Sequence, residues 1–229
     1  MSETVKFTCQ QVPVESGAFA GFAELNEYRR KLLELGMIGV DANGIGFGNL
    51  SIRDGVTSRF YITGSATGGI SELMPSHYAR VVAYDFARNW LQCEGSTIAS
   101  SESLTHAAVY EADPTVFSVI HCHDMKLWAA LLGKEAPATP KEIEYGTPEM
   151  AYAVRNLLKV REVKRRKIFV MAGHEGGVVV WEGCGGSVSG SVQVRAGQAF
   201  SNVQHPMTEE IRAKELRAKG KARDMKNQF

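Results

Sequence analysis

The chain has 229 residues, of which 44% are hydrophobic and 22% are charged, and its formal net charge is +1. This composition is that of a globular protein with a substantial core, and so small a net charge provides no general attraction to nucleic acid or to an anionic membrane. No apolar stretch approaches the ~20 residues needed to span a bilayer, so neither a membrane nor a nucleic-acid partner is expected.

Helical periodicity and turn signals define the first predicted elements. Apolar residues at helical spacing predict a helix over residues 20–36, which Gly36 ends as a C-cap. Two short strands are predicted at residues 49–53 (NLSIR) and 59–63 (RFYIT). The Asp-Gly turn signal between them, at Asp54, predicts that they form a hairpin.

A glycine-rich loop at residues 64–69 separates this hairpin from the next elements. Residues 80–86 (RVVAYDF) are interpreted as a strand that runs into a turn near the next glycine, because β-branched and aromatic residues favour strands. A helix is then predicted over residues 101–112, with Ser100 or Ser101 as its N-cap.

The next predicted elements again alternate between strand and helix. The apolar run of residues 116–123 (VFSVIHCH) predicts a buried strand, and residues 126–133 (KLWAALLG) predict a short helix. Thr147 followed by proline and glutamate is typical of a helix start, and it opens a predicted helix over residues 148–162.

The last predicted elements are a hairpin and a charged helix. Residues 167–174 (KIFVMAGH) predict a buried strand, and residues 177–181 (GVVVW) are its expected hairpin partner. Residues 208–229 are interpreted as a charged helix and tail. Because strands and helices interleave and no linker divides the chain, we expect one α/β domain over residues 1–229.

Two histidines close the predicted strand of residues 116–123. His121 and His123 point to the same face of a strand, about 6.6 Å apart along the backbone, and His174 closes the next predicted strand. Three neutral nitrogen ligands with an open fourth position form a typical catalytic zinc site, although Mn²⁺, Co²⁺ or Fe²⁺ accept the same ligands. For the His-x-His pair alone, polar residues that merely end a strand are an equally good interpretation.

Four separate motifs resemble those of the class II aldolase/adducin family. They are FGNLSIR, YITGSATGG, ASSESLTHAAVYEADPTVFSVIHCHDMKLW and VMAGHEGGVVVW, and they preserve the family's order and spacing over roughly residues 20–185. The resemblance implies a three-layer α/β/α fold with a mixed, largely antiparallel central sheet. It also implies a homo-oligomer, usually a tetramer, with sites between neighbouring subunits.

The resemblance also assigns roles to residues of this chain. Glu102 would act at the metal as general acid/base. The implied metal ligands are His121, His123, His174 and Glu102. The residues that would hold a substrate phosphate are Gly48, Asn49, Thr63, Gly64, Ser100 and Ser101. Taken alone, Glu102 has a simpler interpretation, because an acid in a first helical turn often only complements the helix dipole.

The implied activity is that of a zinc-dependent aldolase-type lyase that cleaves a small ketose phosphate, or a related hydroxy-carbonyl compound, through a metal-stabilised enediolate. A pentulose-phosphate 4-epimerase and a sugar-phosphate dehydratase are alternatives at the same site. A non-catalytic, adducin-like interaction domain is an alternative of another class. The three intact histidines favour an enzyme, because the interaction domain needs no metal.

Some residues depart from the family pattern or stand outside it. The loop YITGSATGG lacks the proline that many sugar-phosphate members have, Glu175 adds a carboxylate after His174, and the family's catalytic tyrosine has no clear counterpart. His106 is interpreted as a structural neighbour of the site. The four cysteines show no CxxC spacing, and the first ten residues lack a secretory signal, so we expect a reduced, cytoplasmic protein.

Overall fold

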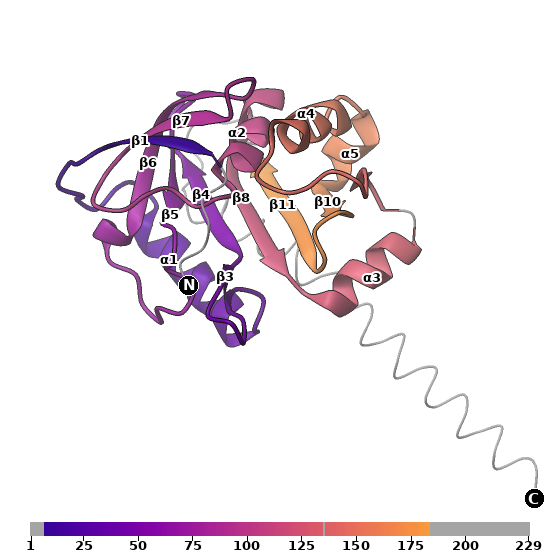
Figure 1. Cartoon of the computed structure of the whole chain (residues 1–229), viewed down its shortest axis with the longest axis horizontal. Coiled ribbons are helices and arrows are strands. Elements are labelled where there is room, and N and C mark those ends of the chain that lie inside the picture. The colour runs from indigo at the N-terminus through magenta and orange to yellow at the C-terminus, as the bar shows by residue number, and fades with distance from the viewer. Residues whose placement is uncertain (1–6, 135, 184–229) are drawn as a thin grey trace, which may run out of the picture.

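The computed structural model describes residues 7–134 and 136–183 (Figure 1). The predicted charged helix and tail at residues 208–229 lie outside the described residues, as do Cys184 and His205. Within the described ranges, no helix combines the length and the apolar character required to cross a membrane.

A nine-stranded mixed sheet forms the centre of the fold. In spatial order its strands are β1 (Thr8–Val12), β7 (Trp90–Glu94), β6 (Tyr78–Asp85), β5 (Phe60–Thr63), β4 (Asn49–Arg53), β8 (Val116–His123), β11 (Gly177–Gly183), β10 (Ile168–Met171) and β9 (Ala138–Thr139). Among these described strands, only the two outermost pairs, β1–β7 and β10–β9, are parallel. The predicted sheet, mixed and largely antiparallel, is therefore confirmed.

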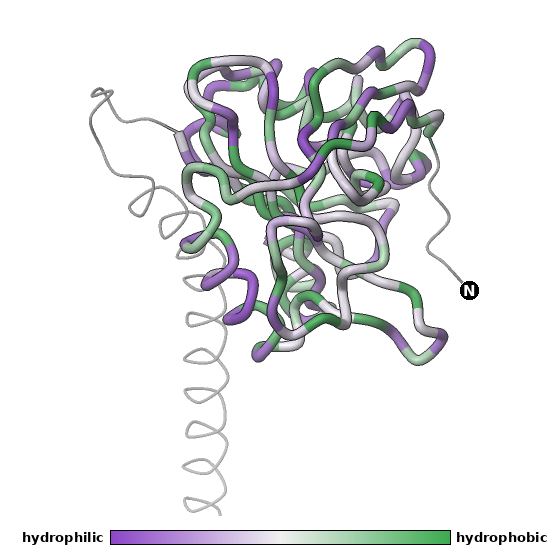
Figure 2. Tube along the Cα trace, turned by 90° about the vertical axis from the view of Figure 1, so that its left-hand side faces the viewer, coloured by the Kyte–Doolittle hydropathy of each residue, from purple (hydrophilic) through white to green (hydrophobic). Residues whose placement is uncertain are grey.

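Helices cover both faces of this sheet. On one face, α1 (Phe22–Glu34) and α3 (Met125–Gly133) pack against a core that includes Leu50 and Cys122. On the other face, α2 (Ser103–Ala112), α4 (Pro148–Leu157) and α5 (Arg161–Arg166) share a core with Val119 and Val179. The predicted three-layer α/β/α arrangement is confirmed, and hydrophilic stretches lie at the periphery (Figure 2).

Two smaller elements complete the described chain. The short strands β2 (Gly39–Val40) and β3 (Gly46–Phe47) pair as a separate antiparallel hairpin, and the 3₁₀ helix η1 (Pro75–His77) precedes β6. The hairpin comes directly before β4, so it lies next to the strand that flanks β8 in the sheet.

The predicted helix signals operate as expected at α1 and α4. Gly36 has a φ of 68°, and the backbone bonds Gly36 N to Leu33 O and Met37 N to Leu32 O form a Schellman end to α1. At α4, the Thr147 side chain accepts a hydrogen bond from the backbone N–H of Met150.

The predicted helix over residues 148–162 is wrong, because the chain forms two helices with a break at Val160. Leu158 and Val163 are both buried in the same core. Five residues of continuous α-helix would rotate these side chains about 140° apart. The extended backbone of Val160 allows both to face the sheet.

Three further expectations are corrected. The strand at residues 80–86 exists as β6, but the chain turns directly after it, and the unpredicted strand β7 follows before Gly95. The unpredicted β1 pairs with β7 at the sheet edge. The N-cap of α2 is Glu102, whose side chain makes no capping bond, and not Ser100 or Ser101.

Candidate metal centre

Strand β8 brings His121 and His123 to one face of the sheet. His121 lies in register between Asn49 of β4 and Val179 of β11. Because side chains alternate along a strand, Cys122 points to the opposite face and packs in the core beneath α1 and α3. The alternation predicted from the sequence is therefore observed.

His174 lies on the turn between β10 and β11, and the prediction that it ends a strand is wrong, since β10 stops at Met171. The turn is closed by backbone bonds from His174 N to Met171 O and from Gly177 N to His174 O. A Cβ atom at Gly177 would lie 2.9 Å from Cδ2 of His174 and 3.3 Å from Nε2 of His121. Glycine here leaves room for both rings.

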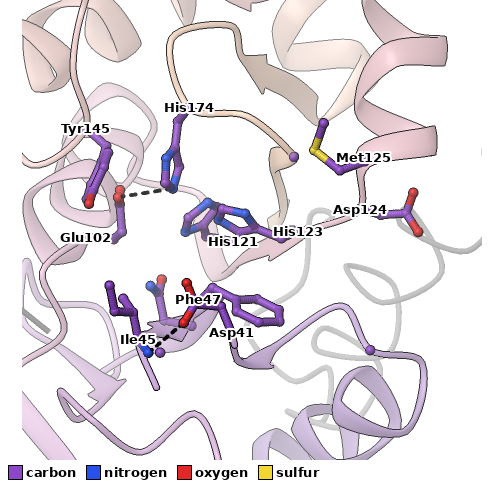
Figure 3. A pocket seen from close by; sticks show the side chains of 15 residues that line it. Asp41, Ile45, Phe47, Glu102, His121, His123, Asp124, Met125, Tyr145 and His174 are labelled. Carbon is purple, nitrogen blue, oxygen red and sulfur yellow. Dashed lines mark hydrogen bonds and ion pairs between the residues drawn. The ribbon is translucent and has the colours of Figure 1, made fainter. Parts of the chain in front are cut away.

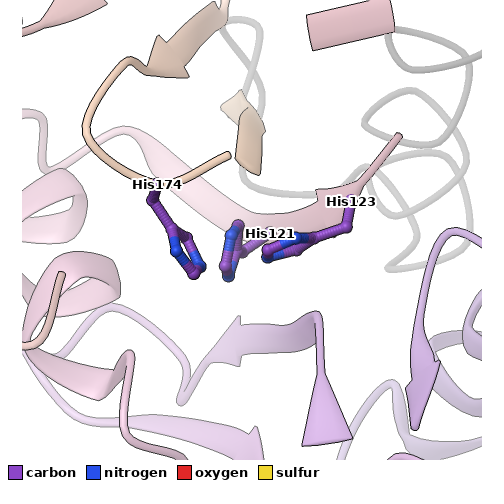
Figure 4. Close-up of side chains that lie close together, drawn as sticks. All are labelled: His121, His123 and His174. Carbon is purple, nitrogen blue, oxygen red and sulfur yellow. The ribbon is translucent and has the colours of Figure 1, made fainter. Parts of the chain in front are cut away.

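The three imidazoles converge (Figure 4). One ligand nitrogen from each of His121, His123 and His174 lies within 4.8 Å of the others. Within the described part of the chain, neither ring nitrogen of His121 nor Nε2 of His123 has a hydrogen-bond partner, although all three atoms are buried. Buried nitrogens without partners are expected where a metal ion is the partner, so these residues fit a divalent cation.

Burial keeps the rings of His121 and His123 neutral, which metal binding requires. Desolvation, with a smaller contribution from His123, lowers the pKa of His121 well below its ordinary value. Desolvation also lowers the pKa of His123 to about 4, partly offset by a hydrogen bond to the backbone of Glu175. Such a bond orients a metal-binding imidazole by occupying its other nitrogen.

Glu102 faces the histidine cluster from the N-cap of α2. Its side chain is only 3% exposed, and Oε1 lies 3.9 Å from Nε2 of His174. Oε2 accepts a hydrogen bond of 2.9 Å from the hydroxyl of Thr105. The Thr105 hydroxyl thus orients the carboxylate toward the imidazoles, which a residue acting only on the helix dipole does not need.

A cavity of about 560 Å³ opens beside the histidines and Glu102. Figure 3 shows Glu102, Tyr145 and His174 on one side of it and Asp41, Ile45 and Phe47 on the other. The second group comes from the β2–β3 hairpin and its turn. No local motif marks Asp41 or Ile45, and Phe47 is only the first residue of the motif FGNLSIR, so the sequence predicted none of the three as a cavity residue.

Tyr145 is a further cavity residue that the sequence did not indicate. Its ring centroid lies 4.1 Å from that of His174. The approach depends on Gly173, where a Cβ atom would lie only 2.4 Å from the Ile143 carbonyl oxygen and 2.6 Å from that of Lys141. The glycine before His174 therefore lets the β10–β11 turn pack against the loop that carries Tyr145.

Of the six residues expected to hold phosphate, some line the cavity and others do not. Only Gly48 and Asn49 line the cavity, whereas the other four do not, namely Thr63, Gly64, Ser100 and Ser101. The Asn49 side chain donates a 3.0 Å hydrogen bond to the hydroxyl of Ser100, and the Thr63 hydroxyl accepts one of 3.3 Å from the backbone N–H of Leu50. These polar groups are engaged with one another and are buried.

Two residues near the cluster stand apart from it. His106 is buried on α2 with its Nδ1 atom 2.7 Å from the hydroxyl of Ser51, and it does not join the three converging imidazoles. Glu175 is exposed and does not line the cavity, so it does not add a carboxylate to the site.

Comparison with known proteins gives a match to a protein family. The family described as Class II Aldolase and Adducin N-terminal domain matches residues 25–204. Comparison with curated protein sequences gives no significant match.

Several solved structures share the fold. An L-fuculose 1-phosphate aldolase is 21% identical with a TM-score of 0.56, covering 85% of this chain and 86% of its own. The L-fuculose-1-phosphate aldolase of Thermus thermophilus is 18% identical with a TM-score of 0.51, covering 80% and 88%. An aldolase II superfamily protein from Pseudomonas syringae is 16% identical with a TM-score of 0.55, covering 84% and 74%.

Proposed function

This chain belongs to the class II aldolase and adducin family, and from that premise we propose that it is a metal-dependent aldolase-type lyase. Its substrate would be a small hydroxy-carbonyl compound of the ketose or ketose phosphate type. The observation that carries the proposal is the convergence of three imidazoles opposite the buried carboxylate of Glu102, at the edge of one cavity.

His121, His123 and His174 would hold the cation, and zinc suits three nitrogen ligands with an open position. Mn²⁺, Co²⁺ and Fe²⁺ are compatible with the same residues. When bound, such an ion supplies Lewis-acid stabilisation of the negative charge that develops on substrate oxygens.

Glu102 would add and remove the proton on the substrate carbon next to the carbonyl. When the carbon–carbon bond breaks, the departing carbinol carbon becomes an aldehyde and releases its hydroxyl proton, while the electron pair of the bond remains on the carbon next to the carbonyl. Protonated Glu102 delivers a proton to that carbon. In the reverse direction Glu102 removes the same proton before the new bond forms. The hydrogen bond from Thr105 fixes the carboxylate, so that Oε1 faces the reacting centre in both directions.

A substrate screen with metal-loaded protein tests the proposal. Ketoses and ketose phosphates should yield aldehyde products, and protein stripped of metal should yield none. If the metal-loaded protein binds these compounds but cleaves none, the lyase proposal fails. Inversion of a carbinol carbon without net cleavage would identify an epimerase, and loss of water would identify a dehydratase.

Metal content separates the enzyme from a non-catalytic, adducin-like interaction domain. The buried ring nitrogens of His121 and His123 that lack partners among the described residues retain a structural purpose only if they bind something, since buried polar groups without partners are costly. Purified protein with about one equivalent of transition metal per chain supports the enzyme. Protein without bound metal, which also fails to take up added Zn²⁺, supports the interaction domain.

We also propose a cytoplasmic homotetramer with its sites near subunit boundaries, as the family assignment favours. Size-exclusion chromatography with light scattering tests the assembly. A fully active monomer would contradict it.

A further inference from the structure

Two cysteine thiols that take no part in the proposed reaction lie together near one edge of the sheet. The Sγ atoms of Cys9 in β1 and Cys93 in β7 are 3.5 Å apart, although 84 positions separate the two residues in the sequence. Cys9 lies in register with Leu91, two residues before Cys93, so both thiols lie on the same face of the sheet. Both are free thiols, and their contact makes them candidates for a disulfide.

Backbone hydrogen bonds at both ends of β1 hold the two thiols in this register. The N–H of Thr8 donates to the carbonyl of Asn89 at 2.9 Å. At the other end, the N–H of Gly95 donates to the carbonyl of Val12 at 3.1 Å. A disulfide has an S–S distance of about 2.05 Å, so the sulfurs must approach by about 1.5 Å. Within the described sheet β1 pairs with β7 alone, so a small movement of this outermost strand breaks no bonds to a second neighbour.

Contact between the sulfurs makes the pair acidic enough to react near neutral pH. A hydrogen bond from the Cys9 thiol lowers the pKa of Cys93 to about 7, in spite of burial, and the backbone N–H of Ala99 adds to this effect. The same hydrogen bond raises the pKa of Cys9, so the pair loses one proton readily and keeps the other. The thiolate is the nucleophilic form of cysteine. Cys122 is the contrast within this chain, because burial raises its pKa to about 12.

Solvent reaches the pair from the side of Cys9. This residue is half-buried, whereas Cys93 is buried in the core that α2 and α4 share. The remaining proton lies between the two sulfurs and can pass from one to the other. The negative charge is therefore available at the sulfur that a small oxidant meets first.

We propose that Cys9 and Cys93 are a redox-active pair, which hydrogen peroxide converts into a disulfide and a dithiol converts back, and that the change acts on the segment leading to Glu102. The Cys9 thiolate attacks one peroxide oxygen, the O–O bond breaks, and Cys9 becomes a sulfenic acid. Cys93 then attacks the Cys9 sulfur, so that the S–S bond forms and the S–O bond breaks. Each oxygen leaves as hydroxide and takes up one of the two thiol protons. The two sulfurs thus lose two electrons, and the peroxide is reduced to two water molecules.

Ala99 connects the thiols to the candidate metal centre. Its backbone N–H donates a hydrogen bond to the sulfurs of the pair, and Glu102 follows three residues later, at the N-cap of α2. A disulfide carries no charge, and a hydrogen bond to a neutral acceptor is weaker than one to an anion. Oxidation should therefore loosen the start of the segment that ends at Glu102.

Treatment of the full-length, reduced protein with one equivalent of hydrogen peroxide near neutral pH tests the disulfide. We expect a product that is lighter by two hydrogen atoms, a proteolytic fragment that joins Cys9 to Cys93, and full recovery of both thiols with dithiothreitol. Peptide mapping follows Cys122 and Cys184 in the same digest. A disulfide between any other two cysteines, overoxidation of Cys9 without a disulfide, or no reaction of the pair would overturn the proposal.

Labelling with iodoacetamide across a range of pH tests the reactivity of the pair. In the wild type, Cys9 should react with a midpoint at about pH 7, and Cys122 should stay unlabelled. In Cys93→Ala the midpoint for Cys9 should rise toward the ordinary thiol value of about 8.5, whereas the control Cys122→Ala should keep the wild-type midpoint. Equal midpoints in the wild type and in Cys93→Ala would overturn the proposal, because the contact between the sulfurs would then not activate them.

Hydrogen exchange of the Ala99 amide tests the link to Glu102. Its exchange with deuterium should be severalfold faster in the oxidised protein than in the reduced protein, whereas the amide of Gly36, at the end of α1, should not change. Peroxide-treated Cys9→Ala, which lacks one of the two sulfurs, should exchange Ala99 at the same rate as its untreated form. Equal exchange of the Ala99 amide in the two wild-type forms would overturn the link between the thiols and the segment before Glu102.

Discussion

The Nε2 atom of His174 lies 3.9 Å from Oε1 of Glu102. One residue belongs to the β10–β11 turn and the other caps α2, so tertiary packing alone brings the imidazole and the carboxylate together. Substitution of a carboxylate that transfers a proton should lower the reaction rate, whereas substitution of one that only complements a helix dipole should lower only the stability.

Replacement of Glu102 by glutamine should abolish proton transfer while metal content persists, because the three histidines remain. General acid–base catalysis typically contributes about 10²–10⁴ in rate, whereas a dipole contact is worth only about 0.3–1 kcal/mol of stability. The measurement is deuterium exchange at the carbon next to the carbonyl of a bound ketose. Thr105→Val, which removes only the orienting hydrogen bond, should cause a smaller loss. Full exchange in metal-replete Glu102→Gln would assign the base to another residue.

Each of His121→Ala, His123→Ala and His174→Ala should lose bound metal and activity together. Loss of one of three protein ligands leaves only two nitrogens to hold the ion. Metal analysis after dialysis measures the effect, with His77→Ala as the control because His77 lies in η1 and is not one of the converging histidines. Full occupancy in any of the three variants would show that another residue completes the ligand set.

Gly177→Ala should weaken metal binding without removing a ligand. The added methyl group would lie 2.9 Å from the His174 ring and 3.3 Å from Nε2 of His121, so the two rings could no longer keep their present positions. Gly133→Ala is a matched control, since a Cβ atom there meets nothing within 4 Å. Competition with a chelator should show weaker binding for Gly177→Ala alone, and equal affinity for both variants would exclude the steric role of this glycine.

Arg29→Met should destabilise the fold and disturb the cavity. The buried guanidinium donates to the backbone carbonyls of Thr67, Gly68 and Ile70 at 2.6–3.1 Å. The bond to Thr67 is buried, and those to Gly68 and Ile70 are partly buried. A buried acceptor left without a partner costs about 1–3 kcal/mol, so urea unfolding should show a loss of about 1–3 kcal/mol. A loss below about 1 kcal/mol, the usual effect of a surface substitution, would show that water replaces these bonds.

The loop that carries Thr67, Gly68 and Ile70 also supports the cavity wall. A Cβ atom at Gly68 would lie 2.1 Å from the carbonyl oxygen of Gly39 in β2, so the loop and the β2–β3 hairpin are in direct contact. Arg29→Met should therefore weaken ketose cleavage by the metal-loaded protein as well as stability. Exposed Arg30→Met on the same helix is the matched control.

The metal-free protein should lose stability as the pH falls from about 6.5 toward 5. Burial lowers the pKa of His106 to about 3, below the ~6.5 of an unfolded histidine. The unfolded chain then binds the proton first, so this contribution to stability is complete above pH 6.5 and declines below it. The slope is up to about 1.4 kcal/mol per pH unit for each such histidine. His106→Gln should reduce this slope in urea unfolding, and an unchanged slope would show that His106 does not titrate in this way.

Local sequence signals predicted those parts of the fold that depend on local geometry. The Schellman end of α1 follows from Gly36, and the common face of His121 and His123 follows from strand alternation. The break before α5 was not predictable from periodicity, because it arises when Leu158 and Val163 compete for one core.

The residues that line the cavity were harder to predict from the sequence than the three histidines. Asp41 and Tyr145 reach it from loops whose positions are set by contacts between distant segments, such as the approach of Gly173 to Ile143. No repeat or spacing encodes such an approach. The resemblance to a family located the candidate ligands, and of the six residues that it assigned to phosphate only Gly48 and Asn49 line the cavity.

The strand order β4–β8–β11 has a consequence for protein synthesis. A ribosome makes the chain from its N-terminus, so His121 and His123 leave the exit tunnel well before His174. Until β11 has been made and pairs with β8, the nascent chain offers only two of the three imidazoles, on a strand with one open edge. Metal loading is thus expected to follow translation of the β10–β11 hairpin, and ribosome-bound chains that end before His174 should emerge without the ion.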